Sequence, residues 1–146
     1  MKLRVLLADD HLLFRTALRM SLETLPDIDI VAQVDTGLAA VACVSRGGVD
    51  VVCMDINMPG LNGIEATRLI VAAHPQVRVI GLSAHADPVR VAEMFQAGAL
   101  GYVLKGSAGQ ELPQAISRVR DRLAYISPEL GFIDVAELMR LVRAAP

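Results

Sequence analysis

The stretch VDVVCMDINMPGLNG, at Val49–Gly63, decides the fold of this chain of 146 residues. Val49–Met54 is a short apolar run rich in β-branched residues, which predicts a strand buried on both faces of a sheet. Asp55 follows where such a strand leaves the sheet, and Met58-Pro59-Gly60 then forces a turn. The stretch therefore predicts a rigidly held, exposed carboxylate at the end of a buried strand.

Apolar runs and helical periodicities alternate on both sides of this stretch. The predicted strands are Leu3–Ala8, Ile28–Val34, Val49–Met54, Val77–Leu82 and Gly101–Leu104. The predicted helices are His11–Thr24 with Asp10 as N-cap, Leu38–Ser45, Gly63–Ala73, Asp87-Pro88 to Ala97, and a fifth ending near Leu123. This alternation predicts a doubly wound α/β fold, in which a five-stranded parallel sheet of order 2-1-3-4-5 is covered on both faces.

The last part of the chain is expected to add a helix to this plan. Residues 1–123 are predicted to form one domain, and residues 124–146 a linker or C-terminal helical extension. The fifth helix should have a ragged first turn, because Ser107 is a candidate cap but Pro113 removes a backbone donor. Asp134, with Glu137 three residues on, predicts a further helix start. Its apolar stripe would be Val135, Leu138, Leu141 and Val142.

Composition narrows the class of protein. No apolar stretch approaches the roughly 18 residues that span a bilayer, and MKLRVLLADDH meets acidic residues too early for a signal peptide, so we expect a cytoplasmic protein. The net charge of −2 and pI of about 5.9 give no reason for nucleic-acid binding by this chain. Cys43 and Cys53 lie in apolar segments without metal-ligand spacing and are predicted to be buried thiols.

Polar residues end four of the predicted strands at one rim of the sheet. Asp9-Asp10 follow the first strand, Asp55 the third, Ser83 the fourth and Lys105 the fifth, where doubly wound folds bind ligands. Carboxylates placed together repel one another and favour a divalent cation, and oxygen ligands favour Mg²⁺. A carboxylate nucleophile, a metal, a hydroxyl and a lysine are what phosphoryl transfer onto Asp55 needs.

The motifs LLADDH, VVCMDINMPGLNG, VIGLSAHAD and GALGYVLK resemble those of the receiver domain of two-component response regulators. The resemblance covers about Lys2–Leu123 and is greatest to the subfamily with a C-terminal LuxR/NarL-type helix-turn-helix output domain. It implies that Asp55 is the phosphoacceptor and that a histidine kinase donates the phosphoryl group. It also implies homodimer formation on phosphorylation, and DNA binding only through an output domain absent from this chain.

The resemblance assigns the remaining site residues by position. Asp9 and Asp10 hold Mg²⁺, together with the carboxylate of Asp55 and the main-chain carbonyl of Asn57. The other assignments are Lys105 as the partner of the phosphoryl group, Ser83 as the hydroxyl that moves towards it, and Tyr102 as the aromatic switch residue.

Two features near the rim stand apart from these assignments. Gly106 replaces the proline that commonly follows the lysine, which leaves the isomer of the Lys105–Gly106 bond open. The three histidines, His11, His74 and His85, show no metal-ligand spacing and are read as ordinary histidines, although His85 is close enough to the rim to influence hydrolysis of an acyl phosphate.

One other function stays open for this sequence, and two others are disfavoured by its residues. A complete single-domain receiver that acts through protein contacts stays open as an alternative to the receiver part of a transcription regulator. An aspartyl-nucleophile phosphatase is disfavoured, because Asn57 stands where a second Asp would act as general acid. A flavin module is disfavoured, because DDHLL is no Gly/Ser/Thr-rich phosphate loop. Beyond self-phosphorylation at Asp55 and slow autodephosphorylation, we expect no enzyme activity.

Overall fold

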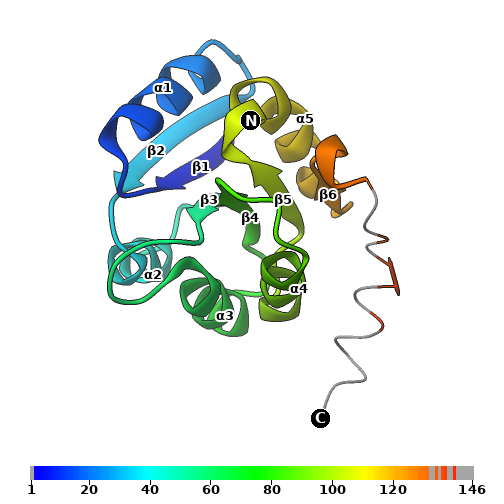
Figure 1. Cartoon of the computed structure of the whole chain (residues 1–146). Coiled ribbons are helices and arrows are strands. Elements are labelled where there is room, and N and C mark those ends of the chain that lie inside the picture. Colours follow the sequence, from blue (N-terminus) through cyan, green and yellow to red (C-terminus); the bar gives the residue numbers. More distant parts are fainter. Residues whose placement is uncertain (1, 132–133, 135, 138–139, 141–146) are drawn as a thin grey trace.

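The computed structural model describes residues 2–131, 134, 136–137 and 140 (Figure 1). The predicted apolar stripe of the C-terminal helix lies outside the described residues. The strands are β1 (Leu3–Ala8), β2 (Ile28–Val34), β3 (Val51–Asp55), β4 (Arg78–Ser83), β5 (Gly101–Leu104) and β6 (Tyr125–Ile126). The helices are α1 (Leu12–Leu22), α2 (Gly37–Ser45), α3 (Gly63–Ala73), α4 (Pro88–Ala97) and α5 (Ala108–Arg120), with 3-10 turns η1 (Lys105–Ser107) and η2 (Pro128–Leu130).

The sheet is parallel, with strand order β2-β1-β3-β4-β5-β6. The predicted doubly wound order is confirmed for the first five strands. The sixth strand was not predicted, because a pairing of two residues leaves no periodicity to detect. It becomes possible because α5 ends at Arg120 and the chain reverses at Arg122, whose φ of 59° is unusual for a residue other than glycine.

Apolar side chains cover both faces of the sheet and form two cores. The core on one face includes Leu6, Val52 and Ile70, and the core on the other includes Val5, Ile80 and Leu112, all at most 1% exposed. In Figure 1, α1 and α5 lie on one side of the sheet and α2, α3 and α4 on the other. Across the described part of the chain, no helix combines the length and the apolar character that crossing a bilayer requires.

Of the two N-cap residues predicted for α1 and α4, one is confirmed and one is wrong. Asp87 caps α4 through a hydrogen bond from the Val89 N–H, as expected. Asp10 is not the N-cap of α1: the capping position is held by His11, which makes no side-chain capping bond, and the Asp9 carboxylate accepts the His11 N–H at 2.8 Å. Asp10 is thereby left to face the rim of the sheet.

The first turn of α5 is ragged, as predicted from Pro113. The 3-10 turn η1 precedes the helix, Ser107 makes no side-chain capping bond, and Pro113 lies inside α5. No peptide bond among the described residues is cis, so Lys105–Gly106 is trans.

Both cysteines are buried free thiols, as predicted. Burial raises the pKa of the Cys53 thiol to about 12, which keeps it protonated and unreactive.

Gly63 allows α3 to start directly against the backbone that carries Asp55. A Cβ atom at Gly63 would lie 2.1 Å from the Asp55 carbonyl oxygen and 2.7 Å from Ile56 Cα. We therefore expect Gly63→Ala to lower the free energy of unfolding by about 2–4 kcal/mol, since backbone atoms cannot move aside cheaply. Gly109→Ala, in α5 with open space around it, should instead be stabilising by up to about 1 kcal/mol. Urea denaturation of both variants checks this, and equal effects would contradict it.

Candidate functional site

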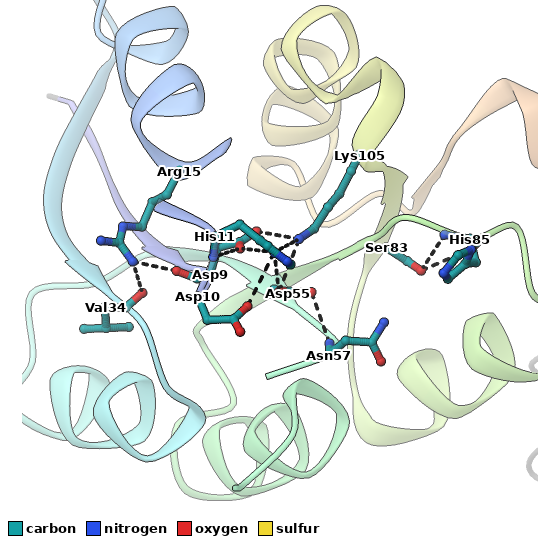
Figure 2. Close-up of polar contacts among 10 residues, drawn as sticks. All are labelled: Asp9, Asp10, His11, Arg15, Val34, Asp55, Asn57, Ser83, His85 and Lys105. Atoms are coloured by element: carbon teal, nitrogen blue, oxygen red, sulfur yellow. Dashed lines mark hydrogen bonds and ion pairs between the residues drawn. The ribbon is translucent and has the colours of Figure 1, made fainter. Parts of the chain in front are cut away.

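The carboxyl ends of β1, β3 and β5 bring the site together. Ala8 pairs with Met54 across β1 and β3, so Asp9 and Asp55 follow at the same level of the sheet. Lys105 follows β5 and reaches back over this edge (Figure 2). The carboxylates and the lysine predicted at the rim are therefore brought together.

Asp55 is a buried carboxylate with few partners. Only 1% of the residue is exposed. Its Oδ1 accepts the Asn57 N–H at 3.1 Å, and its Oδ2 lies 3.2 Å from Lys105 Nζ. Burial raises the pKa of Asp55 to about 6, and the charge of Asp9 adds to the rise, while the Asn57 N–H and Lys105 oppose it. Its carboxylate was predicted to be exposed, but it is buried at the end of β3, beside Asp9 and Lys105.

Lys105 supplies the positive charge that faces these carboxylates. Its Nζ lies 2.8 Å from Asp9 Oδ2, and it also lies 4.8 Å from the centre of the Phe14 ring. The face of this ring attracts the ammonium group and helps to hold it at the site. Lys105 is thus placed to neutralise negative charge at the edge of the sheet.

His11 belongs to this cluster, although sequence reasoning read it as an ordinary histidine. Its Nδ1 lies 3.2 Å from Asp9 Oδ1, 3.5 Å from Asp10 Oδ1 and 3.8 Å from Asp55 Oδ2. The same nitrogen lies 3.2 Å from Lys105 Nζ. The available signal was its position directly after the two aspartates, at the start of α1, which places it at the same rim.

Arg15 fixes the backbone of the first strand end. Its Nη1 donates to the carbonyl oxygens of Asp9 at 2.6 Å and Val34 at 3.3 Å, as Figure 2 shows. These bonds join the ends of β1 and β2 to α1. Arg15 therefore fixes the backbone of Asp9, and nothing in the sequence pattern predicted this role for Arg15.

Ser83 and Tyr102 do not contact the carboxylates directly. The Ser83 hydroxyl donates to the His85 carbonyl and accepts the His85 N–H, both at 3.1 Å (Figure 2). Tyr102 is fully buried. Burial raises the pKa of Tyr102, and the Ser83 hydroxyl lies close enough to oppose the rise, although the two groups miss hydrogen-bond geometry. Ser83 ends β4 at the rim of the sheet, as predicted, and the switching roles of both residues stay predictions.

The acidic cluster fits a divalent cation. Ligand atoms of Asp9, Asp10, His11 and Asp55 lie within 4.8 Å of one another. Asp9 Oδ2 and Asp55 Oδ2 are buried without a well-aligned hydrogen bond among the described residues, so the Lys105 charge is their main compensation. Carboxylate oxygens of this kind suit Mg²⁺. The main-chain carbonyl of Asn57 stays a predicted ligand.

The family model described as the response regulator receiver domain matches residues 5–117. Together with the sheet order and the acidic edge, this match defines the class, and the chain belongs to the response regulator receiver domain family.

The similar proteins are response regulators. The transcriptional regulatory protein DegU of Brevibacillus brevis is 38% identical over 141 residues, which make up 97% of this chain and 60% of DegU. The response regulator UvrY of Escherichia coli strain K12 is 40% identical over 144 residues, which make up 99% of this chain and 64% of UvrY. The chain thus spans about three-fifths of the length of these curated relatives.

Solved structures agree with the fold. A LuxR-family two-component response regulator from Aurantimonas sp. SI85-9A1 is 31% identical, with a TM-score of 0.85 over 99% of this chain and all of that one. The signal receiver domain of the putative response regulator NarL from Mycobacterium tuberculosis is 32% identical, with a TM-score of 0.77 over 83% of this chain and 98% of that domain.

Proposed function

We propose that this chain is a phosphorylation-dependent switch in which Asp55 accepts a phosphoryl group with Mg²⁺ bound at the acidic edge. The observation that carries the proposal is the pairing of a buried Asp55 carboxylate with Lys105 and Asp9 at the carboxyl edge of the sheet. A buried carboxylate nucleophile suits phosphoryl transfer when a nearby ammonium group can stabilise the charge of the transferred group.

The transfer step follows from these contacts. An Asp55 carboxylate oxygen attacks the phosphorus of the donor, a new P–O bond forms, and the bond between phosphorus and the leaving group breaks with its electron pair. The product is an acyl phosphate. Mg²⁺, when held by the carboxylates of Asp9, Asp10 and Asp55, supplies positive charge for the phosphoryl oxygens. Lys105 provides a second positive charge, and the Asn57 N–H orients the attacking carboxylate.

The signal would leave the site through the loops after β4 and β5. A phosphoryl group adds roughly −1.5 to −2 charges and three acceptor oxygens, which attract Ser83 and Lys105. The Ser83 hydroxyl is bonded to the backbone of His85, so its movement would exchange these local bonds for bonds to the phosphoryl group. Tyr102 lies on β5 beside this loop, and its rearrangement would change the face of α4 and β5.

The partners follow from the class of protein. We expect a histidine kinase as the donor and homodimer formation on phosphorylation. The similarity to DegU and UvrY supports a role as the receiver part of a transcription regulator, with DNA contacted through an output domain rather than through these residues.

Labelling by a small-molecule phosphodonor tests the proposal. With acetyl phosphate and Mg²⁺ the chain should gain one acid-stable, hydroxylamine-sensitive phosphoryl group by intact-mass spectrometry. With EDTA labelling should fall at least about tenfold, because the crowded carboxylates then lack their counter-charge. Labelling that is equally fast without a divalent metal would contradict the proposed role of the acidic edge.

A further inference from the structure

The segment that follows α5 makes buried polar contacts that the phosphoryl site does not require. Ser127 is fully buried. Its hydroxyl accepts the Leu104 N–H at 2.9 Å and donates to Glu111 Oε1 at 2.7 Å. Tyr125 Oη donates to the same Glu111 oxygen at 2.9 Å. One carboxylate of α5 therefore organises two hydroxyl groups of the segment that contains β6.

These contacts end on the backbone that carries Lys105. Leu104 is the residue directly before Lys105, and it pairs with Ser83 of β4 on its other side. The Ser127 N–H donates to the Tyr102 carbonyl at 3.0 Å. The end of β5 thus lies between Ser83 on one side and Ser127 on the other, and Figure 1 shows β6 beside β5 and α5.

The segment is also anchored beyond the hydroxyl contacts. Leu130, at the end of η2, is fully buried and packs in the same core as Tyr102. Ile126 pairs with Tyr102 across β5 and β6. The residues from Tyr125 to Leu130 therefore form part of the folded body, and their position depends on the position of β5.

We propose that Glu111 and Ser127 are positioning residues that couple the segment Tyr125–Leu130 to Lys105. Phosphorylation of Asp55 and the placement of this segment then control each other. The inference rests on the proposed function, because it needs a phosphoryl group that draws Lys105 inwards. It adds a second path by which the phosphorylation state of Asp55 could be transmitted, towards the residues that follow the receiver fold.

The energetics favour coupled movement over independent movement. A shift of Lys105 that carries the Leu104 N–H either takes the Ser127 hydroxyl with it or leaves a buried donor unpaired, which is costly. Ser127 is in turn bound to a carboxylate, and hydrogen bonds to charged acceptors are the stronger kind. Coupling of this kind is reciprocal for binding free energies, so a change in the placement of Tyr125–Leu130 should alter the affinity of the site for a phosphoryl analogue.

Tyr125 can serve only as a donor in this arrangement. Burial and the Glu111 carboxylate raise the pKa of Tyr125 to about 12. Its hydroxyl keeps its proton across the physiological pH range and donates it to Glu111 Oε1.

Hydrogen exchange of the full chain of residues 1–146 tests the coupling. Beryllium fluoride with Mg²⁺ mimics the phosphoryl group, and it should slow exchange of peptides covering 100–106 and 122–131 in the wild type. In Ser127→Ala and Glu111→Gln the response of 122–131 should shrink by roughly fivefold, while 100–106 still responds. The affinity of the chain for beryllium fluoride should also fall by roughly fivefold in both variants, because the coupling of two equilibria is reciprocal.

Matched variants keep the test specific. Ser117→Ala and Glu129→Gln alter exposed residues of α5 and η2 and should behave as wild type. If Ser127→Ala does not fold, Tyr125→Phe removes one bond to Glu111 and should weaken the response in part. If the folded variants still show the full slowing of exchange in 122–131, the coupling is wrong, but the proposed function is not affected. A wild type that takes no label from acetyl phosphate overturns the proposed function, and this inference with it.

Discussion

Asp55→Asn is expected to remove labelling by acetyl phosphate down to background, the largest effect that a single substitution in this chain should have. The amide is not a nucleophile and cannot form an acyl phosphate. Its oxygen can still accept the Asn57 N–H, which Asp55 Oδ1 now accepts at 3.1 Å, so the local fold should persist. Intact-mass spectrometry after incubation with acetyl phosphate and Mg²⁺ measures the effect.

The matched control is Asp35→Asn. Asp35 is exposed after the end of β2, at the same edge of the sheet, but it is not among the residues that approach one another at the acidic site. This variant should be labelled as wild type. Full labelling of Asp55→Asn would mean that another residue accepts the phosphoryl group, and the assignment of Asp55 would then be wrong.

Strand ends were predictable because their signals are local. A buried β-branched run followed by a polar residue places that residue at the carboxyl edge of a parallel sheet, and this logic located Asp9, Asp55 and Lys105 correctly. Boundaries also followed from local chemistry, as at Asp87 and Gly98, where a capping carboxylate and a left-handed glycine with φ of 110° begin and end α4.

What the sequence could not predict depends on contacts between distant segments. The β6 strand exists through pairing of two residues with β5 and through Ser127, 23 residues beyond Leu104. The position of His11 depends on the direction of the chain between β1 and α1. In that conformation the His11 N–H donates to the carboxylate of Asp9 and not to that of Asp10. The burial that raises the Asp55 pKa likewise arises only when the ends of β1, β3 and β5, distant in the sequence, come together.

The raised pKa of Asp55 should make the metal-free protein lose stability as the pH rises. Its pKa is raised from 3.8 to about 6, mainly by burial, so between these values the folded state binds more protons than the unfolded chain. The contribution of Asp55 to the free energy of unfolding is therefore fully present below about pH 4 and is lost as the pH rises through about 6. At pH 7 the buried charge should destabilise the fold by up to about 3 kcal/mol, at 1.36 kcal/mol for each pKa unit.

Comparison with Asp55→Asn isolates this contribution from those of the other carboxylates. In EDTA the variant should be more stable than the wild type at pH 7, and the difference should shrink towards pH 4.5, with urea denaturation as the measurement. Asp35→Asn should show no such pH dependence. Mg²⁺ at 1,000 times its Kd should reverse the order of stability at pH 7, since a ligand that binds only the folded wild type then stabilises it by about 4.1 kcal/mol. A stability difference that stays constant between pH 4.5 and 7 would contradict the cost of burying the Asp55 charge. An Mg²⁺ effect as large in the variant as in the wild type would contradict the role of Asp55 as a metal ligand. Under the proposed function, the desolvation that makes the Asp55 charge costly would also favour binding of Mg²⁺ and formation of the acyl phosphate, because both relieve that uncompensated charge.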